Sequence, residues 1–244
     1  MKAKPILFST DMVNAINNNL KCQTRRTQGL EKLNKHPDWY RYDSDSNYED
    51  KLKHLHYFEL LDLQGDPKEQ YTNVACKIKP GDILWVRESW ALSGFCFDEG
   101  FASITYKDGS VKTYYPSFNG IENWFIRKVD KLQDKGYIEA DPDDEERFNI
   151  KKLKWEPSIF MPKWACRLLL KVTNVRAERL HDITEDDAIL EGTSHYGNYN
   201  LATESFRAVW ESINGKGSWN LNPWVWVYEF EKCKKPENLD LNRL

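Results

Sequence analysis

Aromatic side chains are dense in this chain, whose 244 residues include 10 Trp, 12 Tyr and 11 Phe. Each such ring buries about 150–250 Å² when it packs, so the chain can build a sizeable hydrophobic core. Apolar residues make up 40% of the sequence and charged residues 30%, which is typical of a globular protein rather than a disordered one. The length allows one large domain or two small ones.

The sequence predicts a cytoplasmic protein that does not enter a membrane. It lacks a run of about 18 apolar residues, and the short apolar stretch 6–8 that follows the basic start is too brief for a secretory signal. The five Cys are scattered without a CxxC pair, which favours reduced thiols over disulfides or a zinc site. His54 and His56 lack a third ligand at metal-binding spacing. We therefore expect neither a metal nor another cofactor.

The charge distribution is uneven although the net charge is only −3 and the isoelectric point is about 6.0. These values exclude the strongly basic surface by which many proteins hold duplex DNA without sequence preference. Basic residues are concentrated in two stretches, 21–35 and 151–171, and an acidic run lies between them at 141–146. Solvated surface explains either basic stretch alone, whereas two stretches that meet in the fold would form a local site for an anionic ligand.

The pattern of apolar residues predicts an α+β domain with a curved or closed sheet. Residues 27–75 and 94–154 are polar or irregular and are predicted to be two insertions, the first with a short helix near 48–62. The other predicted elements are a helix over 10–19, a strand over 83–90, a hairpin of 101–106 and 111–115 around Asp108-Gly109, a central strand within 168–172, helices over 185–191 and 203–213, and a final strand over 224–230.

The segment 21–26 (KCQTRR) is the most informative for chemistry. At helical spacing, Lys21 and Thr24 fall on one side of a turn, where a lysine with a lowered pKa can act as a general base beside a hydroxyl. Arg25 and Arg26 carry forked donors that suit phosphate or carbonyl oxygens. A basic helix end, favoured by the helix dipole, is the structural alternative.

Residues 19–26 (NLKCQTRR) resemble the G-x-K-x-x-T-x-R signature of ASCH domains, which have a PUA-like fold. Further similar segments are Pro80-Gly81-Asp82 before a strand, 170–173, 180–188 and the closing strand 224–230. More narrowly, the chain resembles long, Trp-rich members from bacteriophages and prophages, which carry W-V-R-E-[ST]-W and W-x-P-S-I-x-M-P-x-W segments, here at 85–90 and 155–164. The resemblance leaves out residues 27–75 and 94–150.

This resemblance implies a small β-barrel with helices at its mouth and a cleft for RNA, a nucleotide or a modified nucleoside. One small member of the family is an amidohydrolase that deacetylates acylated cytidine with a Thr nucleophile, a Lys base and a Glu. Carried over by motif, the nucleophile is Thr24 and the base is Lys21, while the Glu position falls on Lys171 and reverses the charge. Glu88 is the candidate that supplies a carboxylate instead.

Charged and aromatic residues also alternate in the predicted strand 83–90. Arg87 shares a face with Trp85, and Glu88 shares the opposite face with Trp90. An aromatic ring beside a charged group is a usual way to hold a nucleobase, and a core-edge ion pair is the alternative interpretation. Trp224 and Trp226 of the last strand are expected in the core. The remaining candidate ligand-binding residues flank the proline-rich loop or follow it: Trp155, Lys163, Trp164 and Lys171.

Three functions remain open on the sequence alone. The first is binding of RNA, a nucleotide or a modified nucleoside in a PUA-like cleft, without a membrane partner. The second is hydrolysis of an acylated nucleoside or of RNA by Thr24, Lys21 and Glu88. The third is an interaction protein, such as a phage accessory protein, that uses the insertions as docking surfaces.

Overall fold

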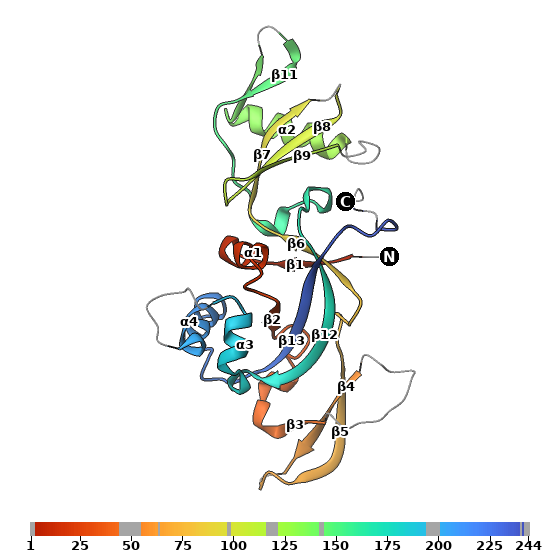
Figure 1. Ribbon diagram of the computed structural model, residues 1–244, viewed down its shortest axis with the longest axis vertical. Helices are drawn as coiled ribbons and strands as arrows, with labels where there is room; N and C mark the ends of the chain where they lie inside the picture. The colour runs from red at the N-terminus through yellow and green to blue at the C-terminus, as the bar shows by residue number, and fades with distance from the viewer. Residues whose placement is uncertain are drawn as a thin grey trace. The chain divides into compact units, whose positions relative to one another are not determined.

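The computed structural model describes residues 3–43, 55–62, 64–96, 99–115, 122–141, 144–193, 201–239 and 241 (Figure 1). Helices and several sheets occur together in this part of the chain, which confirms the α+β class. The chain divides into two compact units: unit 1 holds Met1–Asn14, Ile83–Leu170 and Lys232–Leu244, and unit 2 holds Ala15–Asp82 and Lys171–Glu231. The predicted insertion 27–75 belongs to unit 2 and the insertion 94–154 to unit 1.

Unit 1 contains strands from the start and the middle of the chain. β1 (Ala3–Leu7) runs parallel to β6 (Ile83–Arg87). β7 (Trp90–Cys96), β8 (Phe101–Tyr106) and β9 (Val111–Tyr114) form an antiparallel sheet in that order. The predicted hairpin around Gly109 is confirmed, with this glycine at φ 85°.

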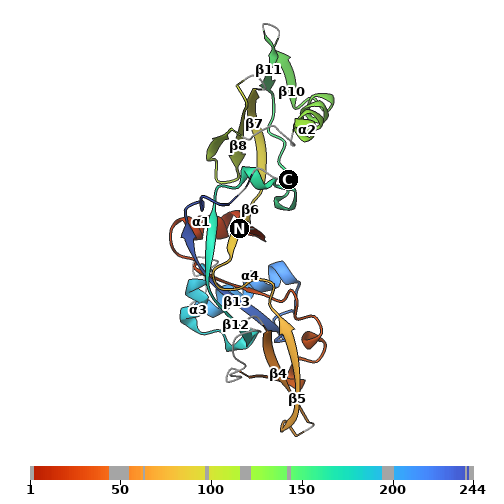
Figure 2. The ribbon, with the colours of Figure 1, turned by 90° about the vertical axis from the view of Figure 1, so that its right-hand side faces the viewer.

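The second insertion is ordered where the sequence suggested irregular structure. α2 (Glu122–Asp134) lies beside the antiparallel pair β10 (Ile138–Asp141) and β11 (Asp144–Ile150) (Figure 2). Phe125, Val129 and Leu132 recur at helical spacing and enter the core of unit 1 together with Trp90 and Trp164. The prediction of irregular structure within 94–154 was therefore wrong over α2, because charged residues on the exposed face of this helix obscured the short apolar stripe.

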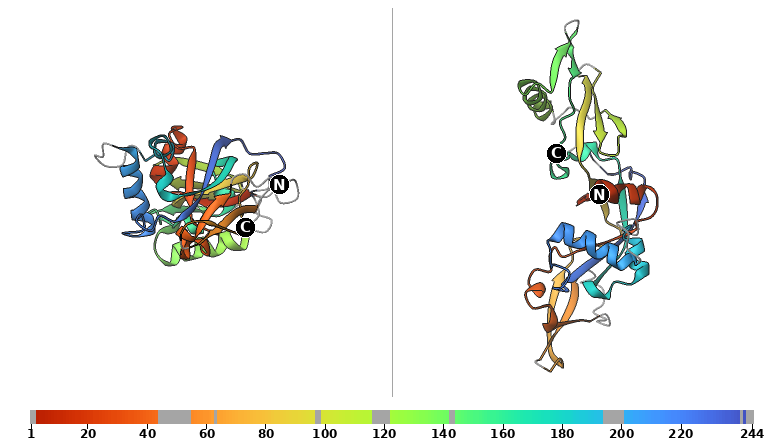
Figure 3. Two further views of the ribbon diagram at one scale, coloured as in Figure 1. Left: turned by 90° about the horizontal axis from the view of Figure 1, so that it is seen from below. Right: turned by 90° about the vertical axis from the view of Figure 1, so that its left-hand side faces the viewer.

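In unit 2, β12 (Leu169–Arg179), β13 (Trp224–Cys233) and β2 (Gln23–Arg26) are neighbours in that order, and β13 runs antiparallel to β2. α1 (Thr10–Asn17) precedes β2 in the chain, and α3 (Glu185–Leu190) and α4 (Ala202–Asn214) lie on one side of β13 (Figures 1 and 3).

The two faces of β13 pack against different elements. Val225 and Val227 face a cluster from α3 and α4, while Trp224, Trp226 and Tyr228 face an apolar cluster from 30–76. The predictions that this strand is covered on both faces and that its two tryptophans belong to the core are confirmed.

The first insertion contains two short 3₁₀ helices, η1 (Leu33–Lys35) and η2 (Pro37–Trp39), and an antiparallel sheet of β3 (Tyr40–Asp43), β4 (Leu55–Leu61) and β5 (Pro67–Ala75). The short helix predicted near 48–62 is wrong over 55–61, because β4 pairs on both sides and buries Phe58 against β13. Residues 48–54 lie outside the described residues.

Two further predictions need correction. The segment that holds Thr24 forms strand β2 rather than a helical turn, because its backbone pairs with β13. The strands of the described ranges form open sheets, so the closed barrel is not seen there. Within the same ranges, no helix is long and apolar enough to cross a membrane.

Candidate functional site

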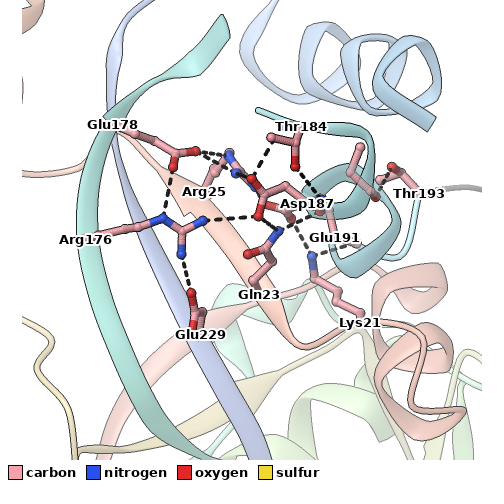
Figure 4. Close-up of polar contacts among 11 residues, drawn as sticks. Lys21, Gln23, Arg25, Arg176, Glu178, Thr184, Asp187, Glu191, Thr193 and Glu229 are labelled. Atoms are coloured by element: carbon pink, nitrogen blue, oxygen red, sulfur yellow. Dashed lines mark hydrogen bonds and ion pairs between the residues drawn. The ribbon is translucent and has the colours of Figure 1, made fainter. Parts of the chain in front are cut away.

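Lys21, Gln23 and Arg25 lie in a buried network of charged groups in unit 2 (Figure 4). The Lys21 ammonium donates to the Glu191 carboxylate at 2.7 Å and to the Glu191 carbonyl oxygen at 2.8 Å. The Arg25 guanidinium reaches the carboxylates of Glu191 at 3.1 Å and Glu178 at 2.6 Å. We call this set the ion network; its members are Lys21, Gln23, Arg25, Arg176, Glu178, Asp187, Glu191 and Glu229.

The ion network holds three cations and four carboxylates. Arg176 bridges its outer part through Glu178, Asp187 and Glu229. Each cation of the network is therefore already paired with a carboxylate. Since carboxylates outnumber cations, the network does not attract an anionic ligand.

Burial sets the electrostatics of Lys21, whose side chain has no solvent exposure. Burial lowers the pKa of Lys21, and the carboxylate of Glu191 opposes that shift. The backbone at Lys21 can approach the end of α3 closely because the residue after Glu191 is Gly192, which has no side chain. A Cβ atom on Gly192 would lie 2.8 Å from the Cβ of Lys21.

Lys21, two residues before β2, and Thr24, within β2, point to opposite faces of the sheet. Arg25 pairs with Val227, which faces α3 and α4, whereas Thr24 pairs with Tyr228, which faces the other cluster. Lys21 contacts the same Glu191 as Arg25 and so shares the α3 face. The expected side-by-side arrangement of Lys21 and Thr24 is therefore wrong, because side chains alternate in a strand.

Glu88 belongs to unit 1 and forms a different ion pair. Its two carboxylate oxygens accept from the Arg167 guanidinium at 2.7 and 2.6 Å. The same guanidinium contacts Asp108 at 2.8 Å and lies 4.0 Å from the ring centre of Tyr106. Burial raises the pKa of Glu88, against the opposing effect of Arg167. The ion-pair interpretation of Glu88 thus describes its geometry, with Arg167 as the partner.

The other predicted binding residues are spread over both units. Arg87 lies over Trp85 at 4.7 Å from the ring centre, as the shared strand face predicted, while Trp90 is a core residue with 1% exposure. Lys171 is exposed and reaches Glu231 at 3.8 Å. Three of the remaining positions are half-buried: Arg26 in β2, Trp155, and Lys163 in η4 (Lys163–Ala165). The Lys107 ammonium lies 3.9 Å from the ring centre of Trp155. The last position, Trp164, is buried.

A pocket of about 410 Å³ in unit 1 combines positive charge with aromatic surface. We call it the basic pocket. Its cationic lining residues are Lys112, Arg167, Lys234 and Lys235, its aromatic ones are Tyr114 and Trp164, and the others are Cys166, Leu169, Cys233 and Leu241. The described lining residues include neither Asp nor Glu. This volume is in the range of small-molecule sites, which span about 300–1,000 Å³.

The three lysines supply the positive charge of the basic pocket, because Arg167 is already balanced by two carboxylates. Lys112, Lys234 and Lys235 are exposed. The indole N–H of Trp164 is buried and has no hydrogen-bond partner in the described part of the chain. A buried donor left unpaired costs about 1–3 kcal/mol, and the burial of this N–H closes it off from a ligand in the pocket.

The Cys166 thiol of the basic pocket contributes little nucleophilic character. Burial raises the pKa of the Cys166 thiol to about 11, so this group stays protonated at neutral pH. The Tyr114 hydroxyl lies within 2.5 Å of the Tyr106 hydroxyl and 2.9 Å from the Ala165 carbonyl oxygen. The pocket is therefore suited to binding through charge and hydrogen bonds.

Several residues of these two sites were not identified from the sequence. Lys234 and Lys235 belong to a lysine-rich run at the end of the last strand. From the sequence alone, such a run indicates only a solvent-exposed strand end. Glu191 directly precedes Gly192, the residue predicted to end the helix. That pattern indicates where the helix ends and does not indicate a buried carboxylate. Of the residues that line the basic pocket, Trp164 is the one that the sequence analysis had named as a candidate binding residue.

The chain was compared with protein families, curated proteins and solved structures. No protein-family model matches this chain, and neither a curated protein nor a solved structure matches it. The resemblance to ASCH domains therefore stays a prediction. Among the described residues, no group of three or more His, Cys, Asp or Glu is placed to hold a metal ion.

Proposed function

We propose that this protein binds a phosphorylated nucleoside, free or within single-stranded RNA, in the basic pocket of unit 1. One observation carries the proposal: Lys112, Lys234 and Lys235 line a single pocket with Trp164, and the described lining residues include no carboxylate. The lysine ammonium groups attract phosphate. The aromatic rings offer apolar surface to a base.

The lysine ammonium groups also donate hydrogen bonds that suit phosphate oxygens. Hydrogen bonds to charged groups are worth about 1.5–3 kcal/mol, more than those between neutral groups.

The resemblance to ASCH domains favours this ligand class as well. We propose that the chain is a PUA-like protein of the long, Trp-rich type, for which RNA, nucleotides and modified nucleosides are the expected ligands. The described sheets are open, so the proposal concerns the ligand class and does not include a closed barrel. The proposed pocket uses Trp164, which belongs to a segment that carries the resemblance.

Hydrolysis by Thr24 and Lys21 has less support than binding. The two side chains point to opposite faces of the sheet that holds β2, and Lys21 is paired with Glu191. Glu88 is held by Arg167 in the other unit. A role as an interaction protein stays a prediction, because no contact of the described residues bears on it.

Calorimetric titration with nucleoside monophosphates, and with the matching nucleosides, tests the proposal. Wild type should bind the phosphorylated compounds more tightly, and the double variant Lys234→Ala/Lys235→Ala should weaken binding by about 10- to 150-fold. The matched control is Lys131→Ala/Lys135→Ala, which removes two exposed lysines of unit 1 outside the pocket. Equal affinity of both double variants, or equal binding of phosphorylated and unphosphorylated ligands, would refute the proposal.

A further inference from the structure

Unit 2 presents an exposed pair of stacked rings outside the sites described above. Trp39, in η2, is 51% exposed although it is one of the largest apolar side chains. The imidazole of His36 lies parallel to its indole, with ring centres 3.9 Å apart and an angle of 11° between the planes. Single exposed apolar residues need no explanation, but a stacked pair is a preformed aromatic surface.

The backbone under this pair is anchored to the core of unit 2. Asn34 donates to the Trp224 carbonyl oxygen at 2.9 Å and accepts from the Trp224 backbone N–H at 2.7 Å. The carbonyl oxygen of Pro37 accepts from the Trp224 indole at 3.0 Å and from Arg179 at 3.1 Å. These bonds fix the chain at Asn34 and Pro37, on both sides of His36, so the backbone that carries the rings is held in place before any ligand binds.

Basic residues precede the stacked pair in the chain. Lys32 and Lys35 are exposed on the same segment. Of the neighbouring acids, Asp38 is paired with Arg179 at 2.8 Å, and the Glu31 carboxylate accepts from the backbone N–H of Gly29 at 2.9 Å. The Glu31 carboxylate keeps its charge because a backbone N–H is neutral, so the two lysines leave one net positive charge on this segment.

We propose that His36 and Trp39 form a stacking platform for an unpaired base of single-stranded nucleic acid, with Lys32 and Lys35 contacting its phosphates. Aromatic rings beside basic side chains are how proteins hold single strands without reading their sequence. The platform belongs to unit 2 and uses none of the residues of the basic pocket. It therefore adds a second, sequence-tolerant contact and does not depend on the proposed function.

Fluorescence anisotropy with a labelled oligo-uridine RNA, an oligo-thymidine DNA and an RNA duplex tests the platform. Trp39→Ala should weaken single-strand binding by about 5- to 150-fold, while Trp39→Phe retains most of it and duplex binding changes little. The control Tyr115→Ala removes an aromatic side chain of unit 1 that is 75% exposed. Because Trp39 is exposed, we expect unchanged thermal unfolding in Trp39→Ala, which separates loss of binding from loss of folding.

Salt dependence tests the role of the lysines. For single strands, the slope of log K against log salt concentration changes by about 0.7 for each phosphate contact. Lys32→Ala/Lys35→Ala should therefore reduce the slope by about 1.4. Wild-type affinity of Trp39→Ala for both single strands, or equal losses for single strands and duplex, would overturn the inference.

The platform and the basic pocket fail independently. If Lys234→Ala/Lys235→Ala binds monophosphates like wild type while Trp39→Ala loses oligonucleotides, the pocket is wrong and the platform stands. If Trp39→Ala is unaffected while the pocket variant loses monophosphates, only the platform is wrong.

Discussion

Glu191 should be the residue of the ion network whose charge matters most for stability. It is the carboxylate that the Lys21 ammonium contacts at 2.7 Å, and it also accepts from Arg25 at 3.1 Å. Its side chain is only 3% exposed. Glu191→Gln keeps the shape and one acceptor oxygen but removes the negative charge. Arg25 retains Glu178 and Asp187, whereas Lys21 loses the carboxylate that its ammonium contacts and keeps the Glu191 carbonyl oxygen.

The cost follows from leaving Lys21 buried without its counter-charge. Breaking a buried ion pair by removing one partner costs about 3–5 kcal/mol. Because Arg25 keeps two carboxylates, we expect the lower end, about 3 kcal/mol of unfolding free energy, or about 6–12 °C in Tm for a chain of this size. Urea unfolding followed by tryptophan fluorescence measures this, because Trp210 and Trp224–Trp226 lie in unit 2.

An exposed Lys–Glu pair in the same unit supplies the matched control. Lys171 and Glu231 are 3.8 Å apart with side chains 52% and 59% exposed, so Lys171→Gln should cost less than about 0.5 kcal/mol. Adding Lys21→Met to Glu191→Gln should recover about 0.5–3 kcal/mol relative to the sum of the single variants. If Glu191→Gln is as mild as Lys171→Gln, the reasoning that Lys21 depends on this carboxylate is refuted.

Two further predictions concern the same region. Gly192→Ala should destabilise by about 2–4 kcal/mol, because the residue has φ 73° and its Cβ would lie 2.8 Å from that of Lys21; chemical unfolding should show a smaller loss for Gly217→Ala, whose Cβ meets nothing within 4 Å. Burial raises the pKa of Asp187, but the hydrogen bond from Gln23 and nearby cations outweigh it and hold that pKa below its ordinary 3.8. This carboxylate therefore stabilises the fold above pH 3.8 and loses that contribution in stronger acid. The stability gap between wild type and Asp187→Asn should narrow below this pH in urea titrations, and a constant gap would contradict the assignment.

Elements with strong local signals were predictable from the sequence. Thr184 caps α3 by accepting from the backbone N–H of Asp187, and Gly192 adopts φ 73° after its end, as the residue types indicated. Asn19 adopts φ 59° after α1, as expected for a residue that closes a helix. Each of these signals acts over a few residues, so the sequence carries it without knowledge of the tertiary structure.

The ion network was not predictable because its partners are far apart in the chain. Arg25 meets Glu178 and Glu191 only after β12, α3 and β2 have packed together. Locally, Lys21 to Arg26 has the composition of a basic helix end, and only pairing with β13 makes it a strand. The partner of Glu88 was not predictable for the same reason, since Arg167 is 79 residues away along the chain. Long-range pairing overrides local propensity in such segments.

The alternation of β2 explains why these conspicuous basic residues are not available to a ligand. A slip of one residue against β13 would move Arg25 to the face of Tyr228 and bring Thr24 to the carboxylates of α3. Glu191 would then be buried without a cation, at a cost of several kcal/mol. The charges of Lys21 and Arg25 therefore help to specify the register of β2 against β13. In that register both side chains are paired with carboxylates. An anionic ligand needs a place where cations outnumber carboxylates, and within the described residues the lysines of the basic pocket provide it.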